Sequence, residues 1–143
     1  IVAAGRVEAL AKLAENPPEK ARVRQLATAG AFHTQFMAPA SDGYAAAAAK
    51  VSAAEPTAGV TLLSNADGQP VANAADAMAK LVAQMTRPVR WDLCNAFIRD
   101  RAVASVVEFP PAGALVGIAK RELKGTPTHA IKTPTDLDGL AEL

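Results

Sequence analysis

Apolar residues recur at helical spacing in several stretches of the chain, and these stretches predict its helices. In residues 74–86, for example, Met78, Leu81 and Met85 fall on one face of a helix. The predicted helices cover residues 6–15, 36–54, 74–86, 91–101 and 115–123. A last helix is expected near the end of the chain, with Thr135 as its N-cap and Asp136 in its first turn.

Shorter apolar runs lie between these stretches and predict strands. They cover residues 1–4, 22–29, 60–63, 104–109 and 128–132, and glycine, proline or polar residues bound them. Strands that alternate with helices are typical of the α/β class with a mainly parallel sheet. In such folds, functional side chains collect in the loops that follow the carboxyl ends of the strands. Here these loops lie around His33, around Asn65 and over residues 110–113.

Composition narrows the class of protein without changing this fold prediction. The chain has 143 residues and a formal net charge of +1, and its aromatic content is 4%. With interleaved charges and few aromatic residues, neither a nucleic acid nor an anionic membrane is an expected partner. No apolar run is long enough to span a bilayer, and Cys94 is the single cysteine, so we expect a cytoplasmic protein. The chain begins in a predicted strand without an initiator methionine, which suggests a piece of a longer protein.

Among the reactive side chains, His33 is the strongest candidate for a catalytic residue when only its position in the sequence is considered. It follows Gly30 just beyond a predicted strand, between Phe32 and Phe36 in sequence. A histidine exchanges protons near neutral pH, so an imidazole at the mouth of a pocket is suited to general-base catalysis. The alternative is a histidine that only hydrogen-bonds its own loop. Position alone leaves both interpretations open.

The other reactive side chains are expected to have structural roles. His129 lies in the last predicted strand, where we expect it to pack or to face solvent. Glu108 ends a strand before two prolines, and we favour a cap for the following turn over a catalytic carboxylate. Cys94 lies among apolar residues and is expected to be buried and inert. Two histidines and one cysteine show no metal-ligand spacing, so no metal is expected.

The sequence contains no recognisable nucleophile for covalent catalysis. Its serines are Ser41, Ser52, Ser64 and Ser105, and none lies in a Gly-x-Ser-x-Gly elbow. A base without a nucleophile cannot carry out covalent acyl transfer. Taken by themselves, the residues support only an α/β chain with one candidate histidine site.

Three segments in order resemble the malonyl-CoA:acyl-carrier-protein transacylases. Residues 30–34, Gly-Ala-Phe-His-Thr, followed by Met-Ala-Pro-Ala at 37–40, are similar to the histidine motif of that family. Residues 84–91 resemble its Gln-Leu-x-x-Pro-Val-x-Trp motif. Residues 107–113 resemble its Val-Glu-Phe/Val-Gly-Pro-Gly strand and turn, although the turn here reads Pro-Pro-Ala-Gly. The resemblance covers essentially the whole chain, and it is nearest to the actinobacterial stand-alone enzymes of fatty-acid synthesis.

The resemblance implies roles for individual residues. In the family, a serine in a Gly-His-Ser-x-Gly elbow attacks malonyl-CoA, and the malonyl group passes to the phosphopantetheine thiol of acyl carrier protein. His33 would be the base that activates this serine, and Gln84 would supply the backbone carbonyl that supports the base. Phe32 matches the malonyl-selective pattern, because its ring leaves no room for the extra methyl group of methylmalonyl. No cofactor is implied beyond the coenzyme A thioester and the carrier protein.

The resemblance also predicts how the chain is organised. Residues 1–29 would be the C-terminal half of a small ferredoxin-like subdomain, and residues 30–143 the C-terminal part of a large, hydrolase-like α/β subdomain. The nucleophile elbow, the arginine that binds the malonyl carboxylate and the oxyanion-hole loop belong to the N-terminal half of the family. We therefore expect this chain alone to be inactive and to need that half as a partner. Two other interpretations stay open: an acyltransferase domain excised from a polyketide or fatty-acid synthase, and a non-catalytic domain that binds carrier protein.

Overall fold

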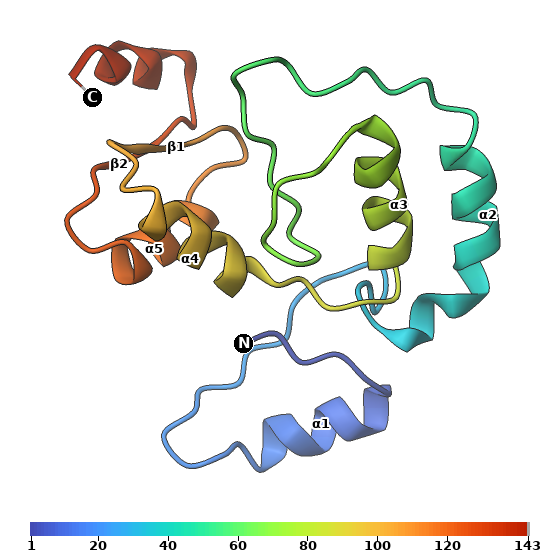
Figure 1. The fold of residues 1–143 in the computed structure, drawn as a ribbon. Helices are drawn as coiled ribbons and strands as arrows, with labels where there is room; N and C mark the ends of the chain where they lie inside the picture. The colour runs from blue at the N-terminus through green and yellow to red at the C-terminus, as the bar shows by residue number, and fades with distance from the viewer. Residues whose placement is uncertain (143) are drawn as a thin grey trace. The chain divides into compact units, whose positions relative to one another are not determined.

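The fold was analysed in a computed structural model that describes residues 1–142 (Figure 1). Contacts between residues divide the chain into two units. The first unit consists of Ile1–Ala66 and Pro70–Val89, and the second of Asp67–Gln69 and the residues from Arg90 onward.

The second unit is built on two parallel strands joined by a helix. Strand β1 (Val106–Glu108) is followed by helix α5 (Ala114–Glu122) and strand β2 (Thr128–Ala130). The register pairs Val106 with Thr128 and Glu108 with Ala130. Helix α5 packs against both strands, as Figure 1 shows. This strand–helix–strand arrangement is the connection that parallel strands require.

Most of the buried apolar side chains lie in this second unit. Helix α4 (Trp91–Asp100) contributes Cys94, which is only 1% exposed. The others are contributed by α5 and the residues after it and after β2: Val116, Ala119, Leu123 and Ile131. Burial, assisted by the carboxylates of Asp67 and Asp92, raises the pKa of the Cys94 thiol. Cys94 is therefore a buried thiol that is hard to ionise, as its apolar neighbours in sequence predicted.

The turn between β1 and α5 is held by the carboxylate of Glu108. Its two oxygens accept hydrogen bonds from the backbone N–H groups of Gly113 (2.9 Å), Leu115 (3.0 Å) and Val116 (2.9 Å). These are N–H groups at the start of a helix, which have no partner inside the helix itself. The bond from Val116, followed by those from Leu115 and Gly113, holds the pKa of Glu108 below its usual value. The predicted capping role of Glu108 is confirmed.

Substituting Glu108→Gln is expected to lower the melting temperature of the protein at neutral pH, because an amide accepts through one atom only. The folded-state pKa is depressed, so the stabilisation is present above the unfolded value of about 4.3 and is lost as pH falls through the folded value. The difference in melting temperature between wild type and variant should therefore begin to shrink only as the pH falls below about 4.3, and it should be smaller at about pH 3 than at about pH 7. Glu122→Gln, which changes an exposed carboxylate of the same helix, is the matched control. A difference that is constant over this range contradicts the capping account.

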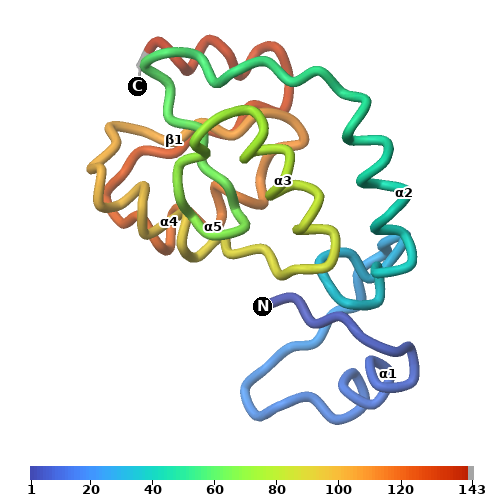
Figure 2. The backbone as a smooth tube through the Cα atoms, turned by 45° about the vertical axis from the view of Figure 1, so that its right-hand side comes forward, coloured from blue at the N-terminus to red at the C-terminus, as the bar shows by residue number. Residues whose placement is uncertain are grey.

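The first unit is mainly helical. It contains α1 (Val7–Glu15), the 3-10 turn η1 (Gln35–Met37), α2 (Ala38–Ala48) and α3 (Ala74–Gln84). Helices α2 and α3 lie side by side in Figures 1 and 2 and are in contact. Within this unit, the described side chains that are fully buried are those of Ala74 and Gln84.

Three predicted strands of the first unit are wrong. Residues 1–4 and 22–29 are irregular, and residues 60–63 form only one isolated antiparallel bridge, between Leu63 and Pro70. A strand exists by pairing its backbone N–H and C=O groups, and the described residues offer no partner to 1–4 or 22–29. At the bridge, Pro70 has no N–H to donate, so a ladder cannot extend from it.

The predicted helix over residues 36–54 is also shorter than expected. The structure has η1 followed by α2, which ends at Ala48. Pro39 lies in the first turn of α2, because a proline is tolerated only there and interrupts a helix that begins earlier. At the other end, Val51 and Ser52 are weaker helix formers than the alanines before them.

The C-terminal helix is present, but its type and its N-cap differ from the prediction. It is a 3-10 helix, η2 (Pro134–Glu142), and Thr135 lies inside it rather than at its N-cap. Asp136 takes the capping role instead: its carboxylate accepts from the backbone N–H groups of Lys132 (2.9 Å) and Thr133 (2.7 Å). These bonds hold the pKa of Asp136 below its usual value. The other helices and the strands β1 and β2 lie within two residues of their predicted bounds or inside them.

Candidate functional site

His33 lies in a short loop of the first unit and is held by the end of α3. The ring nitrogen Nδ1 is 2.8 Å from the backbone oxygen of Gln84. The backbone N–H of the same histidine donates to the next carbonyl, that of Met85, at 3.1 Å. Two consecutive carbonyls at the C-terminus of one helix therefore fix both the main chain and the side chain of His33.

The bond to Gln84 determines the tautomer of the imidazole. A carbonyl oxygen can only accept, so Nδ1 must carry the proton in this bond. Nε2 of the neutral ring then has the free lone pair and is the nitrogen that can take a proton. Since His33 is exposed, this nitrogen can reach a reacting group. The contact between His33 and Gln84 that the family resemblance implied is thus present in the structure.

The backbone of His33 is itself unusual. Its φ is +64°, in the left-handed region that side chains other than glycine rarely adopt. Such a conformation costs on the order of 1–3 kcal/mol and persists where the surrounding structure imposes it. Here the surrounding structure is the end of α3 and the hydrogen bonds within the loop. Strained backbone of this kind is concentrated at functional sites.

The loop that carries His33 is closed by the next residue. Thr34 Oγ1 donates to the backbone oxygen of Ala31 at 2.7 Å and accepts from the N–H of Phe36 at 3.3 Å. No role was predicted for Thr34 from the sequence. The signal that identifies it is a threonine inside a tight turn, where hydroxyl groups commonly bond to nearby backbone.

Phe32 is the third residue that the sequence placed at the site. Its ring is 46% exposed, and it lies beside Gly30, where an added Cβ would be 3.4 Å from the ring and 3.5 Å from the sulfur of Met37. Phe32 and its neighbour in sequence, His33, are both exposed, and an exposed aromatic ring is suited to contact with a further part of a protein or with a ligand. The structure thus brings His33 and Gln84 into contact and leaves Phe32 open.

The side chain of Gln84 is a separate feature from its carbonyl. It is 4% exposed, and its Nε2 has no hydrogen-bond acceptor among residues 1–142. The contribution of Gln84 to His33 therefore comes from the main chain alone in this structure.

His129 has a structural role, as its position in the last predicted strand indicated. Its Nε2 donates to the backbone oxygen of Asp136 at 2.6 Å, and its ring packs against Gly139, where an added Cβ would be 2.6 Å from the ring. The ring links β2 to η2. In the part of the chain that the structure describes, no group of three histidine, cysteine or acidic residues could hold a metal ion. None of the described helices has the length and apolar character needed to cross a membrane.

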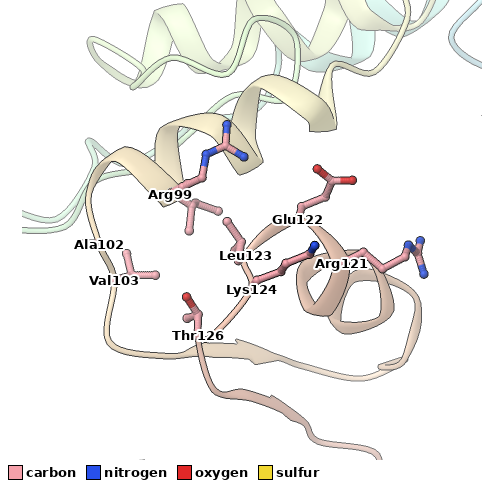
Figure 3. Close-up of a pocket in the computed structure, with 9 residues that line it drawn as sticks. Arg99, Ala102, Val103, Arg121, Glu122, Leu123, Lys124 and Thr126 are labelled. Carbon is pink, nitrogen blue, oxygen red and sulfur yellow. The ribbon is translucent and has the colours of Figure 1, made fainter.

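A hollow of about 420 Å³ in the second unit is lined by apolar, polar and charged residues, three of which are basic (Figure 3). Arg99 comes from the last turn of α4, and Arg121 from the last turn of α5, with Lys124 just beyond it. Cations at these positions are stabilised by the partial negative charge at the C-terminus of a helix. That local effect accounts for the cluster without a ligand.

No family model matches the chain. Individual relatives match it closely. The malonyl CoA-acyl carrier protein transacylase of Mycolicibacterium smegmatis is 74% identical over the whole chain, which covers 50% of that protein. The crystal structure of MCAT from Mycobacterium tuberculosis superposes with a TM-score of 0.88 at 65% identity, over 96% of this chain and 45% of that one.

The chain belongs to the malonyl-CoA:acyl-carrier-protein transacylase family. It corresponds to the C-terminal portion of the actinobacterial members and spans about half the length of the curated relatives it matches. The predicted α/β acyltransferase fold is confirmed by the same superposition. The division into a ferredoxin-like part up to residue 29 and a hydrolase-like part from residue 30 stays a prediction.

A further transacylase structure contains a carrier protein. It is described as a type II polyketide synthase acyl-carrier protein in complex with its malonyl-transacylase, and it superposes with a TM-score of 0.76 at 26% identity. The match covers 85% of this chain and 38% of the neighbour.

Proposed function

We propose that this chain supplies the histidine side of a malonyl-CoA:acyl-carrier-protein transacylase. The observation that carries the proposal is the pair of bonds from His33 to the consecutive carbonyls of Gln84 and Met85, which leave Nε2 free to act as a base. The family of the chain supports the choice of reaction. The substrates proposed are malonyl-CoA and the phosphopantetheine thiol of acyl carrier protein, and no cofactor is required.

In the first half-reaction, His33 Nε2 takes the proton of a serine hydroxyl while the serine oxygen attacks the carbonyl carbon of the malonyl thioester. The C–S bond then breaks, and the imidazolium returns the proton to the departing sulfur of coenzyme A. The malonyl group is left as a serine ester. The hydrogen bond from Nδ1 to the Gln84 oxygen becomes charge-assisted when the imidazolium forms, and it strengthens at that point.

The second half-reaction reverses these transfers with a different thiol. His33 Nε2 takes the proton of the phosphopantetheine thiol, and the sulfur attacks the serine ester. The ester C–O bond breaks, and the proton passes to the serine oxygen. The same nitrogen therefore serves as base and then as acid in each half, which is the usual division of labour in a Ser–His pair.

The nucleophile of this reaction belongs to the other half of the enzyme. None of the four serines of this chain lies in a nucleophile elbow, and an arginine for the malonyl carboxylate would likewise be contributed by that half. Phe32, exposed beside His33, is proposed to limit the space beside the α-carbon of the acyl group and so to favour malonyl. Acyl carrier protein is proposed as the macromolecular partner, supported by the carrier-protein complex among the structural neighbours.

The test compares malonyl transfer by residues 1–143 alone with transfer by the full-length enzyme, the protein that contains them. Each is incubated with malonyl-CoA and phosphopantetheinylated carrier protein, and the intact mass of the carrier protein is followed. We expect the full-length enzyme to add one malonyl group and residues 1–143 alone to add none. The N-terminal half alone, which lacks the base, should be inactive, and mixing the halves should restore transfer.

Two results would contradict this proposal. Transfer by residues 1–143 alone, verified by mass to contain nothing else, would show that the chain holds its own nucleophile. A full-length enzyme that binds carrier protein without transferring any acyl group would favour a non-catalytic binding domain.

A further inference from the structure

We propose that Thr34 is a positioning residue for the base: its hydroxyl closes the turn that holds the His33 imidazole in its productive orientation. The inference rests on the proposed function and extends it to a residue that takes no part in proton transfer. It is carried by the two hydrogen bonds of Thr34 Oγ1 and by the left-handed backbone between them.

The Thr34 hydroxyl closes the loop of His33 through two hydrogen bonds. Thr34 Oγ1 donates to the oxygen of Ala31 at 2.7 Å, the short end of the range for hydroxyl donors. The bond bridges Phe32 and His33, so both site residues lie inside a ring that this hydroxyl closes. The same oxygen accepts from the N–H of Phe36 at 3.3 Å and so joins the ring to η1.

The ring that the Thr34 hydroxyl closes contains strained backbone at His33. His33 has a φ of +64°, a conformation that a free loop of this sequence would leave. Outside the ring, the restraints on His33 are the bonds to the carbonyls of Gln84 and Met85. The bond to Gln84 holds one edge of the imidazole, and the bond to Met85 holds the backbone N–H of His33. The direction of the Cα–Cβ bond depends in addition on the backbone of residues 31–34. The Thr34 hydroxyl restrains that backbone.

Loss of the Thr34 hydroxyl is expected to slow catalysis by misplacing the base. Proton transfer requires Nε2 to lie within hydrogen-bond reach of the serine oxygen, and small displacements of a catalytic group are costly. Loss of the hydroxyl allows the turn to relax, so that His33 spends less time in the reactive position. The freed groups of Ala31 and Phe36 lie near the surface, where water can bond to them, so the fold itself should survive.

The experiment compares Thr34→Val and Thr34→Ser in the full-length enzyme. Valine keeps the shape and the β-branch but has no hydroxyl, whereas serine keeps the hydroxyl. We expect Thr34→Val to lower kcat by about 10–100-fold with KM for malonyl-CoA changed by less than about 3-fold. Thr34→Ser should recover kcat to within about 3-fold of wild type.

A matched control removes a different turn hydroxyl. Thr133 Oγ1 donates to Asp136 Oδ2 at 3.0 Å and belongs to the second unit, whereas the loop of His33 belongs to the first. Thr133→Val should leave kcat unchanged, while its melting temperature and that of Thr34→Val should both stay close to wild type. A fall in kcat without a fall in stability is the pattern that a purely structural hydroxyl does not produce.

The outcomes distinguish this inference from the proposed function. If His33→Ala is inactive while Thr34→Val has the kcat of wild type, the positioning role is refuted and the base is retained. If Thr34→Ser is as slow as Thr34→Val, the hydroxyl is not the active feature and the inference also fails. If His33→Ala keeps full activity, the proposed function itself fails.

Discussion

Replacing His33 by asparagine in the full-length enzyme should lower kcat/KM for malonyl transfer by about 10²–10⁴-fold, the usual contribution of a positioned general base. Asparagine is chosen because it tolerates the left-handed backbone that His33 adopts at φ +64°. Its side-chain N–H can also still donate toward the Gln84 oxygen. The group that is lost is the basic nitrogen on the far side of the ring.

Stability provides the control for this substitution. Because the backbone conformation and one hydrogen bond are retained, the melting temperature should change little. An enzyme that keeps wild-type kcat/KM would show that another group removes the serine proton. An enzyme that unfolds would instead indicate that the imidazole, and not the backbone, supports the loop.

Gly68→Ala is expected to be the most destabilising single-methyl change in the second unit. An added Cβ would clash with Cβ of Leu93 and would lie 2.6 Å from its carbonyl carbon, and both atoms belong to the first turn of α4. The φ of Gly68 is +71°, which adds backbone strain. Together, overpacking and strain should cost roughly 3–5 kcal/mol, measured by chemical denaturation of the full-length enzyme.

Gly59→Ala separates the two contributions. Its φ is +81°, similar to that of Gly68, but an added Cβ would meet nothing within 4 Å. This variant should lose only the backbone part, about 1–2 kcal/mol. Equal losses at the two positions would contradict the close approach of Gly68 to α4.

The sequence predicted those elements whose stabilisation is local. Helices α3, α4 and α5 carry apolar stripes, and each lies within about one turn of its predicted bounds. A proline or a glycine follows shortly after the ends of α3 and α5, at Pro88 and Gly125. The capping role of Glu108 was predictable for the same reason, since it bonds to backbone groups at most eight residues away.

Elements that depend on distant partners were not predictable. Residues 22–29 have a pattern that suits a strand, yet they pair with nothing among residues 1–142. No periodicity links His33 to Gln84, which lies 51 residues further along. That contact followed only from the resemblance of two separate motifs to one family. Thr34 was overlooked because the tight turn that its hydroxyl closes was not itself predicted from the sequence.

The support of His33 by main-chain carbonyls has a consequence for genetics. Both Gln84 and Met85 contribute oxygens that every amino acid possesses, so an alanine scan leaves these acceptors in place. A Ser–His–Asp triad, by contrast, is broken by a single codon change at the acid. The two carbonyl acceptors of His33 are therefore retained when the side chains at positions 84 and 85 change. A screen for loss of function would overlook the role of these carbonyls.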